Sequence, residues 1–264
     1  MELNIYQIDA FTDIVFKGNP AAVIPLDNWL PPETMQALAL ENNLSETVFF
    51  VPTPNDPAHD FHIRWFTPTV EADICGHATL AASWVLFNKL GFADEEIRFA
   101  TNEVGSLFVK SIGDKIELNF PVQAGVPASI PEGLNAVLGC EVVEFLEASK
   151  AMAVLKTADD VRNCKPDLSY IEKMVLDGLI ITAKGDNCDC VSRYFVPQGG
   201  VDEDPVTGSA HCTVIPYWAD KLDKVKLHAK QVSARGGDLY CQLVGERVYM
   251  QGDAVLYLEG RVYL

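Results

Sequence analysis

The sequence predicts an α+β fold of two pseudo-symmetric halves, each a barrel-like β-sheet wrapped around one central apolar helix, with the active site in the cleft between them. The first observation is an internal repeat: residues 63–68 (IRWFTP) recur as 192–197 (SRYFVP), and residues 75–78 (CGHA) recur as 207–210 (TGSA). Two copies of one unit can face each other, so we expect the active-site residues near the repeated glycines, at which a helix begins in each copy. The second observation is a constant offset of 132 residues, half of the 264-residue chain, that relates Gly105, Leu107, Gly113 and Lys115 to Gly237, Leu239, Gly245 and Arg247.

The third observation is a helix without a polar face in each copy. Residues 76–87 contain no charged side chain, and the first one to follow is Lys89. Residues 208–219 are similarly apolar. A helix that is apolar on all sides belongs inside a core, so each is expected to be central in its half. Pro216 predicts a kink in the second helix.

The other elements follow from local patterns. Two prolines and a glutamate at 31–33 predict the start of a surface helix. Residues 105–120 are expected to form two strands, and a segment with Pro, Gly and Ser at 121–132 is expected to be the linker. The predicted halves are therefore 1–122 and 123–264, with the last strands expected to cross back to the first half. Short β-branched and aromatic runs predict further strands at 3–9, 21–25, 47–51 and 60–66.

Composition excludes several classes of protein. With 48% hydrophobic residues the chain can bury a sizeable core, and a net charge of −17 argues against a nucleic-acid partner. The seven scattered cysteines predict reduced thiols in a cytoplasmic protein. No stretch reaches the roughly 18 apolar residues of a membrane span, and no signal-like segment begins the sequence, so we expect neither a membrane partner nor export.

Gly76 and Gly208 are the first candidates for ligand binding. Each leaves a helix N-terminus with unpaired N–H groups and the positive end of the dipole, which suits a carboxylate. The alternative is that each glycine only allows tight entry into its helix. Asp204 ends an acidic segment before the second helix, where carboxylates can instead cap the helix. Glu46 lies between the surface helix and a strand, a position that by itself suits a solvent-facing residue or one that pairs with another side chain.

His77 and Cys75 lie at the opening of the first central helix. His77 is expected to be neutral, because the helix dipole and burial disfavour the protonated ring, although a satisfied core histidine is an alternative. The helix N-terminus could lower the pKa of Cys75 and produce a thiolate. Its repeat partner is Thr207, so two thiols cannot act symmetrically. Cys188 and Cys190 are expected on one face of a strand. They lack a second pair at zinc spacing, so no metal is expected. No phosphate loop or dinucleotide-binding pattern is present.

Four segments resemble the PhzF-like proteins of phenazine biosynthesis, which are relatives of diaminopimelate epimerase and proline racemase. They follow the family's order and span nearly the whole chain. The resemblance implies a diaminopimelate epimerase-like fold, no metal or organic cofactor, and a homodimer. The segments are Gln7–Thr12 with Gly18–Val23, Asn43–Thr47, Cys75–Thr79 and Glu203–His211.

The resemblance also implies roles for single residues. In the phenazine enzyme, the glutamate that matches Glu46 shuttles a proton during isomerisation of an amino-hydroxy-cyclohexadiene carboxylate. Residues that match His77, Asp204 and Ser209 surround its substrate, and backbone amides near the helix openings hold polar groups. The implied site is Glu46, His77 and Asp204 for catalysis, Gly76, Gly208 and Ser209 for substrate binding, and Cys75 as an accessory.

One departure from the epimerases narrows the function. Those relatives place a cysteine at both helix openings, whereas this chain has Cys75 and Thr207, which argues against two-thiol racemisation. We therefore expect a cofactor-independent isomerase that uses Glu46 to move a proton on a small cyclic or unsaturated amino or hydroxy carboxylic acid. The alternatives are an amino-acid epimerase or racemase and a non-catalytic carboxylate-binding protein.

Overall fold

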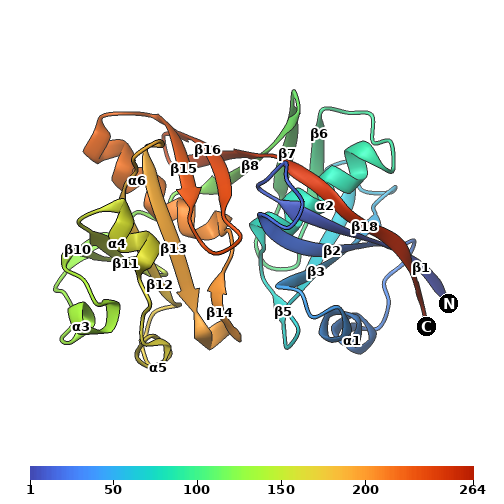
Figure 1. Cartoon of the computed structure of the whole chain (residues 1–264). Coiled ribbons are helices and arrows are strands. Elements are labelled where there is room, and N and C mark those ends of the chain that lie inside the picture. Colours follow the sequence, from blue (N-terminus) through green and yellow to red (C-terminus); the bar gives the residue numbers. More distant parts are fainter. The chain divides into compact units, whose positions relative to one another are not determined.

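The computed structural model describes residues 1–264 and divides into two compact units (Figure 1). Unit 1 comprises Met1–Asn119 and Gln251–Leu264, and unit 2 comprises Phe120–Met250. The sequence-based boundary after residue 122 lies close to the first boundary of the structure. The last 14 residues, 251–264, belong to unit 1, so this unit is built from both ends of the chain. None of the helices is both long and apolar enough to cross a membrane.

Unit 1 contains a sheet and two helices, α1 (Pro32–Asn42) and α2 (Gly76–Asn88). Strand β1 pairs antiparallel with β18 and β2, β2 runs parallel to β3, and β3 is antiparallel to β4. Strand β4 is antiparallel to β5 and parallel to β6, and β6, β7 and β8 continue antiparallel. The strands are β1 (Glu2–Ala10), β2 (Asn19–Pro25), β3 (Glu46–Pro52), β4 (Phe61–Phe66), β5 (Glu71–Ala72), β6 (Glu96–Ala100), β7 (Leu107–Ile112), β8 (Lys115–Pro121) and β18 (Ala254–Tyr263).

Unit 2 repeats this order of pairing. Strand β10 pairs antiparallel with β9 and β11, β11 runs parallel to β12, and β12 is antiparallel to β13. Strand β13 is antiparallel to β14 and parallel to β15, which is antiparallel to β16. The repeat seen in the sequence is thus confirmed as a repeat of topology. The strands are β9 (Val126–Ala128), β10 (Val142–Glu147), β11 (Ala151–Leu155), β12 (Leu179–Lys184), β13 (Cys190–Val196), β14 (Val201–Asp204), β15 (Lys226–Gln231), β16 (Gly237–Val244) and β17 (Arg247–Gly252).

Two sequence-based expectations in unit 2 were wrong. The segment at 121–132 is not only a linker, because it contains β9, which pairs with β10. Cys188 lies before β13 and not within it, and its Sγ donates to the Cys190 carbonyl at 3.3 Å. The helices of this unit are α3 (Leu134–Leu138), α4 (Ala158–Asn163), α5 (Leu168–Ile171) and α6 (Gly208–Leu222), with a 3₁₀ turn at Pro197–Gly199.

The two apolar helices are central, as predicted. Helix α2 packs against β1, β2, β3, β7 and β18, and Figure 1 shows it enclosed by the strands of unit 1. Helix α6 packs against β12, β13, β15 and β16 within unit 2. Their predicted first residues, Gly76 and Gly208, are also their first residues in the structure. Helix α6 continues through Pro216 to Leu222. Because these helices have no polar face, only a surrounding sheet can remove them from water.

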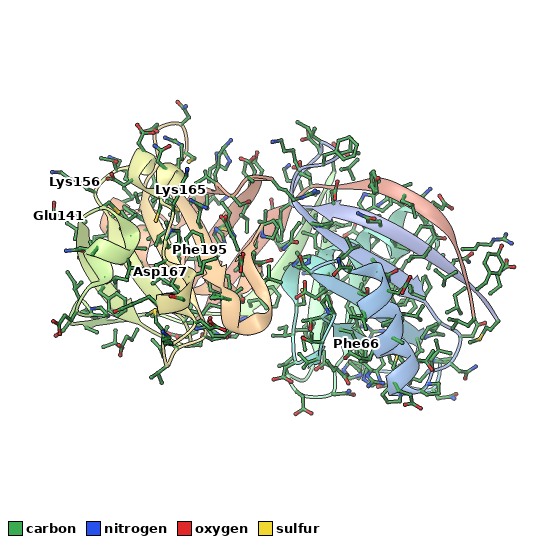
Figure 2. The ribbon with its side chains drawn as sticks, turned by 60° about the horizontal axis from the view of Figure 1, so that its bottom comes forward. Phe66, Glu141, Lys156, Lys165, Asp167 and Phe195 are labelled. Atoms are coloured by element: carbon green, nitrogen blue, oxygen red, sulfur yellow. The ribbon has the colours of Figure 1, made fainter.

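The repeated segments 63–68 and 192–197 have a phenylalanine at the same position, Phe66 in unit 1 and Phe195 in unit 2. Both side chains are labelled in Figure 2. Phe66 belongs to the core beneath the surface helix α1, where Met35 and Phe49 are fully buried. Phe195 occupies the corresponding core of unit 2. The repeat therefore carries equivalent packing as well as equivalent strands.

An arginine–glutamate pair is repeated as well. Arg64 on β4 holds Glu71 on β5 through two hydrogen bonds of 2.7 Å. Arg193 on β13 holds Glu203 on β14 in the same bidentate way, at 2.7 and 2.8 Å. Such fork-like pairs fix both distance and orientation. They anchor the short strands that lead into α2 and α6.

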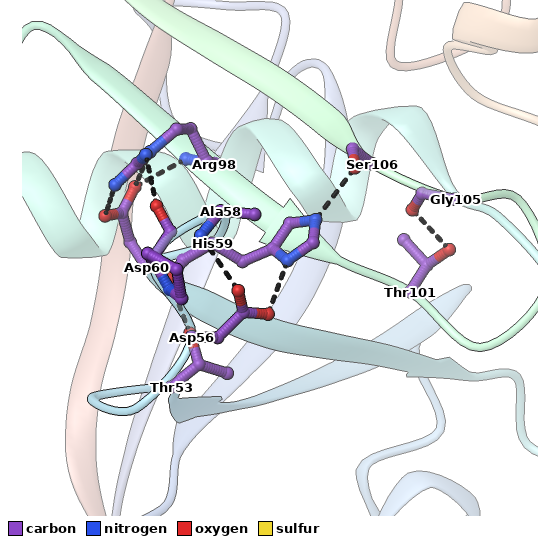
Figure 3. A network of polar contacts seen from close by, with 10 residues as sticks. Thr53, Asp56, Ala58, His59, Asp60, Arg98, Thr101, Gly105 and Ser106 are labelled. Carbon is purple, nitrogen blue, oxygen red and sulfur yellow. Dashed lines mark hydrogen bonds and ion pairs between the residues drawn. The ribbon is translucent and has the colours of Figure 1, made fainter.

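A second polar network fastens the 53–60 loop of unit 1 (Figure 3). The Arg98 guanidinium donates to Asp60 at 2.7 and 3.1 Å. His59 Nδ1 lies 2.7 Å from Asp56 Oδ2, and its Nε2 lies 2.8 Å from Ser106 Oγ. These contacts tie the loop to β6 and to the residue before β7.

Candidate active site

The start of α2 is a helix terminus without a cap. Cys75 is the N-cap in extended conformation, its side chain makes no capping hydrogen bond, and the first turn has no acidic residue. The backbone N–H groups of a first turn have no partner within the helix and carry the positive end of its dipole. Gly76 adds no side chain in front of them. The backbone N–H groups at this terminus are thus open to a carboxylate, as the predicted binding role requires.

Glu46 and His77 meet at this terminus. Glu46 is the first residue of β3, and the parallel register places it beside Ala21 of β2. Its Oε2 lies 3.0 Å from His77 Nε2, and only 17% of its side chain is exposed. The His77 residue is 3% exposed. Sequence alone allowed a solvent-facing or a pairing role for Glu46, and in the structure its carboxylate lies against a buried imidazole.

The Glu46–His77 contact is close but incomplete. Although the atoms are 3.0 Å apart, Glu46 Oε2 and His77 Nε2 both lack a hydrogen bond of acceptable angle, and both are shielded from solvent. Buried polar atoms almost always have a partner, so unused bonding capacity at a buried pair is unusual. The pair therefore retains a donor and an acceptor for a third group.

Two residues that were not proposed as site residues from the sequence hold the other side of the ring. Asn19 Nδ2 lies 3.1 Å from His77 Nδ1, and Ser45 Oγ donates to Asn19 Oδ1 at 3.2 Å. With Oδ1 engaged by Ser45, the amide nitrogen faces Nδ1, so Nε2 carries the proton that faces Glu46. Asn19 is fully buried as the first residue of β2, and no pattern in the sequence by itself marks it as a site residue.

The protonation states differ from the sequence-based expectations. Burial, followed by the Glu46 charge, raises the pKa of Cys75 to about 11, so its thiol is neutral near pH 7. The expected helix-dipole effect on this thiol is outweighed by desolvation. Burial lowers the pKa of His77, but Cys75 and the Glu46 carboxylate outweigh it and hold this pKa well above its usual value. The neutral ring expected from the sequence fits the Asn19 amide that donates to Nδ1, but that expectation left out the Glu46 carboxylate, which favours a proton on the ring.

The start of α6 in unit 2 is also uncapped. Thr207 is the extended N-cap residue without a side-chain cap, and Gly208 begins the helix without an acidic residue in the first turn. Asp204 ends β14, and its carboxylate accepts a short hydrogen bond from the Thr207 hydroxyl. Ser209, in the first turn, is half-buried. The three predicted site residues of unit 2, Asp204, Gly208 and Ser209, are thus grouped at one helix terminus.

Gln231 fixes this group and was missed by the sequence analysis. It is 1% exposed on β15. Its Oε1 accepts from the Thr207 amide at 2.8 Å, and its Nε2 donates to the Asp204 carbonyl at 2.6 Å and to the Thr207 hydroxyl at 3.1 Å. Because the hydroxyl oxygen accepts from Gln231, its proton is directed at Asp204. A buried glutamine on a strand has no distinctive sequence pattern.

His211 does not act as a second His77. Its Nδ1 donates to the Thr207 carbonyl at 2.7 Å, and Ser192 Oγ lies 3.5 Å from its Nε2. Burial lowers the pKa of His211 to about 4, although the bond to Thr207 opposes this shift. The ring is therefore neutral at physiological pH and anchors the first turn of α6.

A pocket of about 170 Å³ in unit 1 lies away from these groups. It is lined by Ile63, Arg64, Trp65, Glu71, Ala72, Asp73, Asn102 and Glu103. Since its Arg64 and Glu71 already neutralise each other, it lacks the unused buried donor and acceptor of the Glu46–His77 pair. The start of α2 is therefore a better candidate site than this pocket.

Similarities to known proteins agree with this architecture. Residues 8–260 match the family described as phenazine biosynthesis-like protein, PhzC-PhzF. An uncharacterized isomerase of Pseudomonas aeruginosa is 46% identical over 100% of both chains. The crystal structure of a PhzF-family phenazine biosynthesis protein from Enterococcus faecalis is 43% identical, with a TM-score of 0.95 over 100% of both chains. A hydroxyproline epimerase from Agrobacterium vitis shares the fold at 9% identity, with a TM-score of 0.64 over 99% of this chain and 92% of that one.

Proposed function

This chain belongs to the phenazine biosynthesis-like (PhzC-PhzF) family, and from that membership we propose that it is a cofactor-independent isomerase. The proposed substrate is a small cyclic or unsaturated amino or hydroxy carboxylic acid. A relative that is 46% identical is named an isomerase, which supports the reaction class. From the resemblance, the proposal also includes a homodimer in the cytoplasm. Light scattering of the purified protein would test the dimer.

The observation that carries this proposal is the buried Glu46–His77 pair. A carboxylate that removes a proton from carbon must be shielded from water and held in place. Glu46 meets both conditions, because it is largely buried and lies 3.0 Å from an imidazole that Asn19 orients. Its Oε2 makes no hydrogen bond and is available to a substrate proton.

The proposed reaction moves one proton between two carbons. The Glu46 carboxylate accepts a proton from a carbon next to a double bond, and the electron pair of the broken C–H bond forms a new double bond beside it. The old double bond shifts its electrons to the far carbon, which takes the proton back from the Glu46 carboxylic acid. Substrate and product have the same atoms, so no oxidant or reductant is needed.

The remaining site residues are assigned to orientation. His77 donates its Nε2 proton towards the Glu46 side of the site and stabilises the carboxylate. The first-turn amides beside Gly76 and Gly208 suit the substrate carboxylate, since neither terminus has a cap. Asp204 and Ser209, at the start of α6, suit an amino or hydroxyl group of a ligand. Fixing the substrate in this way selects the face that Glu46 protonates.

The test is proton exchange in heavy water. The protein is incubated with a panel of small unsaturated carboxylates, and mass spectrometry measures deuterium uptake. Once a substrate is found, Glu46→Gln should lower single-turnover exchange by about 10² to 10⁴-fold or more, because it removes the general base. Glu41→Gln, at an exposed glutamate of α1, is the matched control and should keep the parent rate. A parent rate in Glu46→Gln would disprove the proposed role.

The alternatives predict different outcomes. An epimerase that uses the Cys75 thiol would lose activity in Cys75→Ser and would racemise its substrate. Burial raises the pKa of this thiol to about 11, so it stays protonated near pH 7 and cannot accept a proton, which favours the isomerase. A carboxylate-binding protein without activity would be stabilised by ligands but would incorporate no deuterium.

A further inference from the structure

We propose that Glu46, Cys75 and His77 also form a binding site for a thiophilic divalent metal ion, with Zn²⁺ as the natural occupant and the ion acting as an inhibitor. The inhibitory part rests on the proposed function, because it assumes that Glu46 carries the proton. Each residue offers one ligand atom, and the three atoms lie within 4.8 Å of one another. Imidazole nitrogen, thiolate sulfur and carboxylate oxygen are the ligands that zinc prefers.

The spacing of these atoms comes close to tetrahedral coordination without reaching it. With bonds of about 2.3 Å to sulfur and about 2.0 to 2.2 Å to nitrogen and oxygen, ligand atoms in a tetrahedron lie roughly 3.3 to 3.6 Å apart. Cys75 Sγ lies 3.4 Å from His77 Nδ1, and Glu46 Oε2 lies 3.0 Å from His77 Nε2. One ion takes only one nitrogen of the ring, so side-chain rotations must bring the third ligand atom nearer.

A second observation independently indicates a ligand. Glu46 Oε2 and His77 Nε2 are buried and lack hydrogen bonds despite their short separation. A cation bound at these two atoms and at the thiolate would satisfy all three residues. When Nε2 binds the ion, the ring proton moves to Nδ1, and rotation of the Asn19 amide, 3.1 Å away, would present its Oδ1 as the acceptor.

The local charges favour a divalent ion. The positive end of α2 opposes a cation, but it amounts to only about half of an elementary charge. Binding releases the Cys75 proton to solvent, after which thiolate and Glu46 carboxylate supply two negative charges. These balance the ion and outweigh the dipole. A metal-bound Glu46 oxygen cannot accept a substrate proton, so occupancy must stop the proposed reaction.

The experiment is a titration of chelator-treated protein with Co²⁺, followed by absorption. Tetrahedral Co²⁺ bound to a thiolate gives a near-ultraviolet charge-transfer band and strong visible bands, and added Zn²⁺ should remove both. Glu46→Gln and His77→Gln should weaken Co²⁺ binding by at least about 10-fold, since loss of second-shell partners alone costs that much. Circular dichroism shows that each variant is folded.

Cysteine variants locate the bound thiolate. Cys75→Ser should lose the charge-transfer band, whereas Cys164→Ser, at another buried cysteine, should keep it. The proposal is overturned by absence of the band in the parent protein, or by its persistence in folded Cys75→Ser. Because this readout needs no substrate, it stands apart from the Glu46→Gln exchange test. Inhibition is then measured as loss of deuterium exchange on adding Zn²⁺ and recovery with chelator, and unchanged exchange in Zn²⁺-loaded protein overturns the inhibitory role.

Discussion

Gln231 offers the sharpest test of how unit 2 holds its part of the site. The substitution Gln231→Met keeps the length of the side chain and removes every hydrogen-bonding atom from it. The buried Thr207 amide then has no acceptor, and the Asp204 carbonyl and the Thr207 hydroxyl lose the donor from Gln231. An unsatisfied buried donor costs about 1 to 3 kcal/mol, and each lost hydrogen bond about 0.5 to 1.5 kcal/mol. We expect a loss of about 3 kcal/mol in the free energy of unfolding.

The assay is urea unfolding followed by circular dichroism, with hydrogen exchange of the first turn of α6 as a local readout. A loss of this size lowers the melting temperature of a domain this large by roughly 10 °C. Gln242→Met on the neighbouring strand β16 is the matched control, because the Gln242 side chain makes no hydrogen bond, and it should change stability by less than about 0.5 kcal/mol. Equal effects of the two substitutions would refute the argument, as would unchanged exchange in α6.

Three further outcomes are expected. At pH 7 Cys75 should react with iodoacetamide at least about 100-fold more slowly than in the urea-unfolded chain, because a pKa of about 11 leaves roughly one thiol in 10⁴ ionised. His211, with a pKa of about 4 when folded and about 6.5 when unfolded, should make the parent about 2 kcal/mol less stable at pH 5 than at pH 7, and His211→Asn should remove that loss. Gly18→Ala should cost at least about 2 kcal/mol, since φ is +63° and a Cβ would lie 2.1 Å from the Ala10 carbonyl oxygen.

Each of these has its own check. The alkylation rate of Cys75 is measured by peptide mass spectrometry, and a rate equal to that of the unfolded chain contradicts the assigned burial. For His211 the sign is fixed because only the unfolded state takes up a proton between pH 6.5 and 4, so stability must fall with pH in that range. Gly91→Ala is the control for Gly18, because its φ is +70° with no atom within 4 Å of a Cβ, and it should cost only about 1 kcal/mol.

The fold could be predicted from the sequence because its main signals are local. The helices beginning at Gly76 and Gly208 are apolar on every side, and such helices are stable only when surrounded. Because the sequence repeats, the same signal appears in both halves and supports the same inference twice. The strand β9 was missed because Val126–Ala128 is too short to show a period, and only its pairing with β10 defines it.

The site could be predicted only in part. His77 and Cys75 are next to a recognisable helix start, but their contact with Glu46 depends on the parallel register of β2 and β3, which no local pattern specifies. The protonation state of Cys75 was misjudged, since burial and the Glu46 charge raise the pKa of the thiol more than the helix dipole lowers it. Asn19 was missed as a site residue because its role depends on the tertiary structure alone.

The pairing of β1 with β18 also has a consequence for biosynthesis. Ala10 and Ala254 are partners at the ends of strands that the ribosome makes 244 residues apart. At roughly 5 to 20 residues per second, the edge of β1 waits about 10 to 50 s for its neighbour. Residues 120–250, by contrast, form a continuous unit and can fold as they emerge. The nascent chain therefore exposes the unpaired edge of β1 until β18 is made, and this interval is when aggregation or chaperone capture would compete with folding.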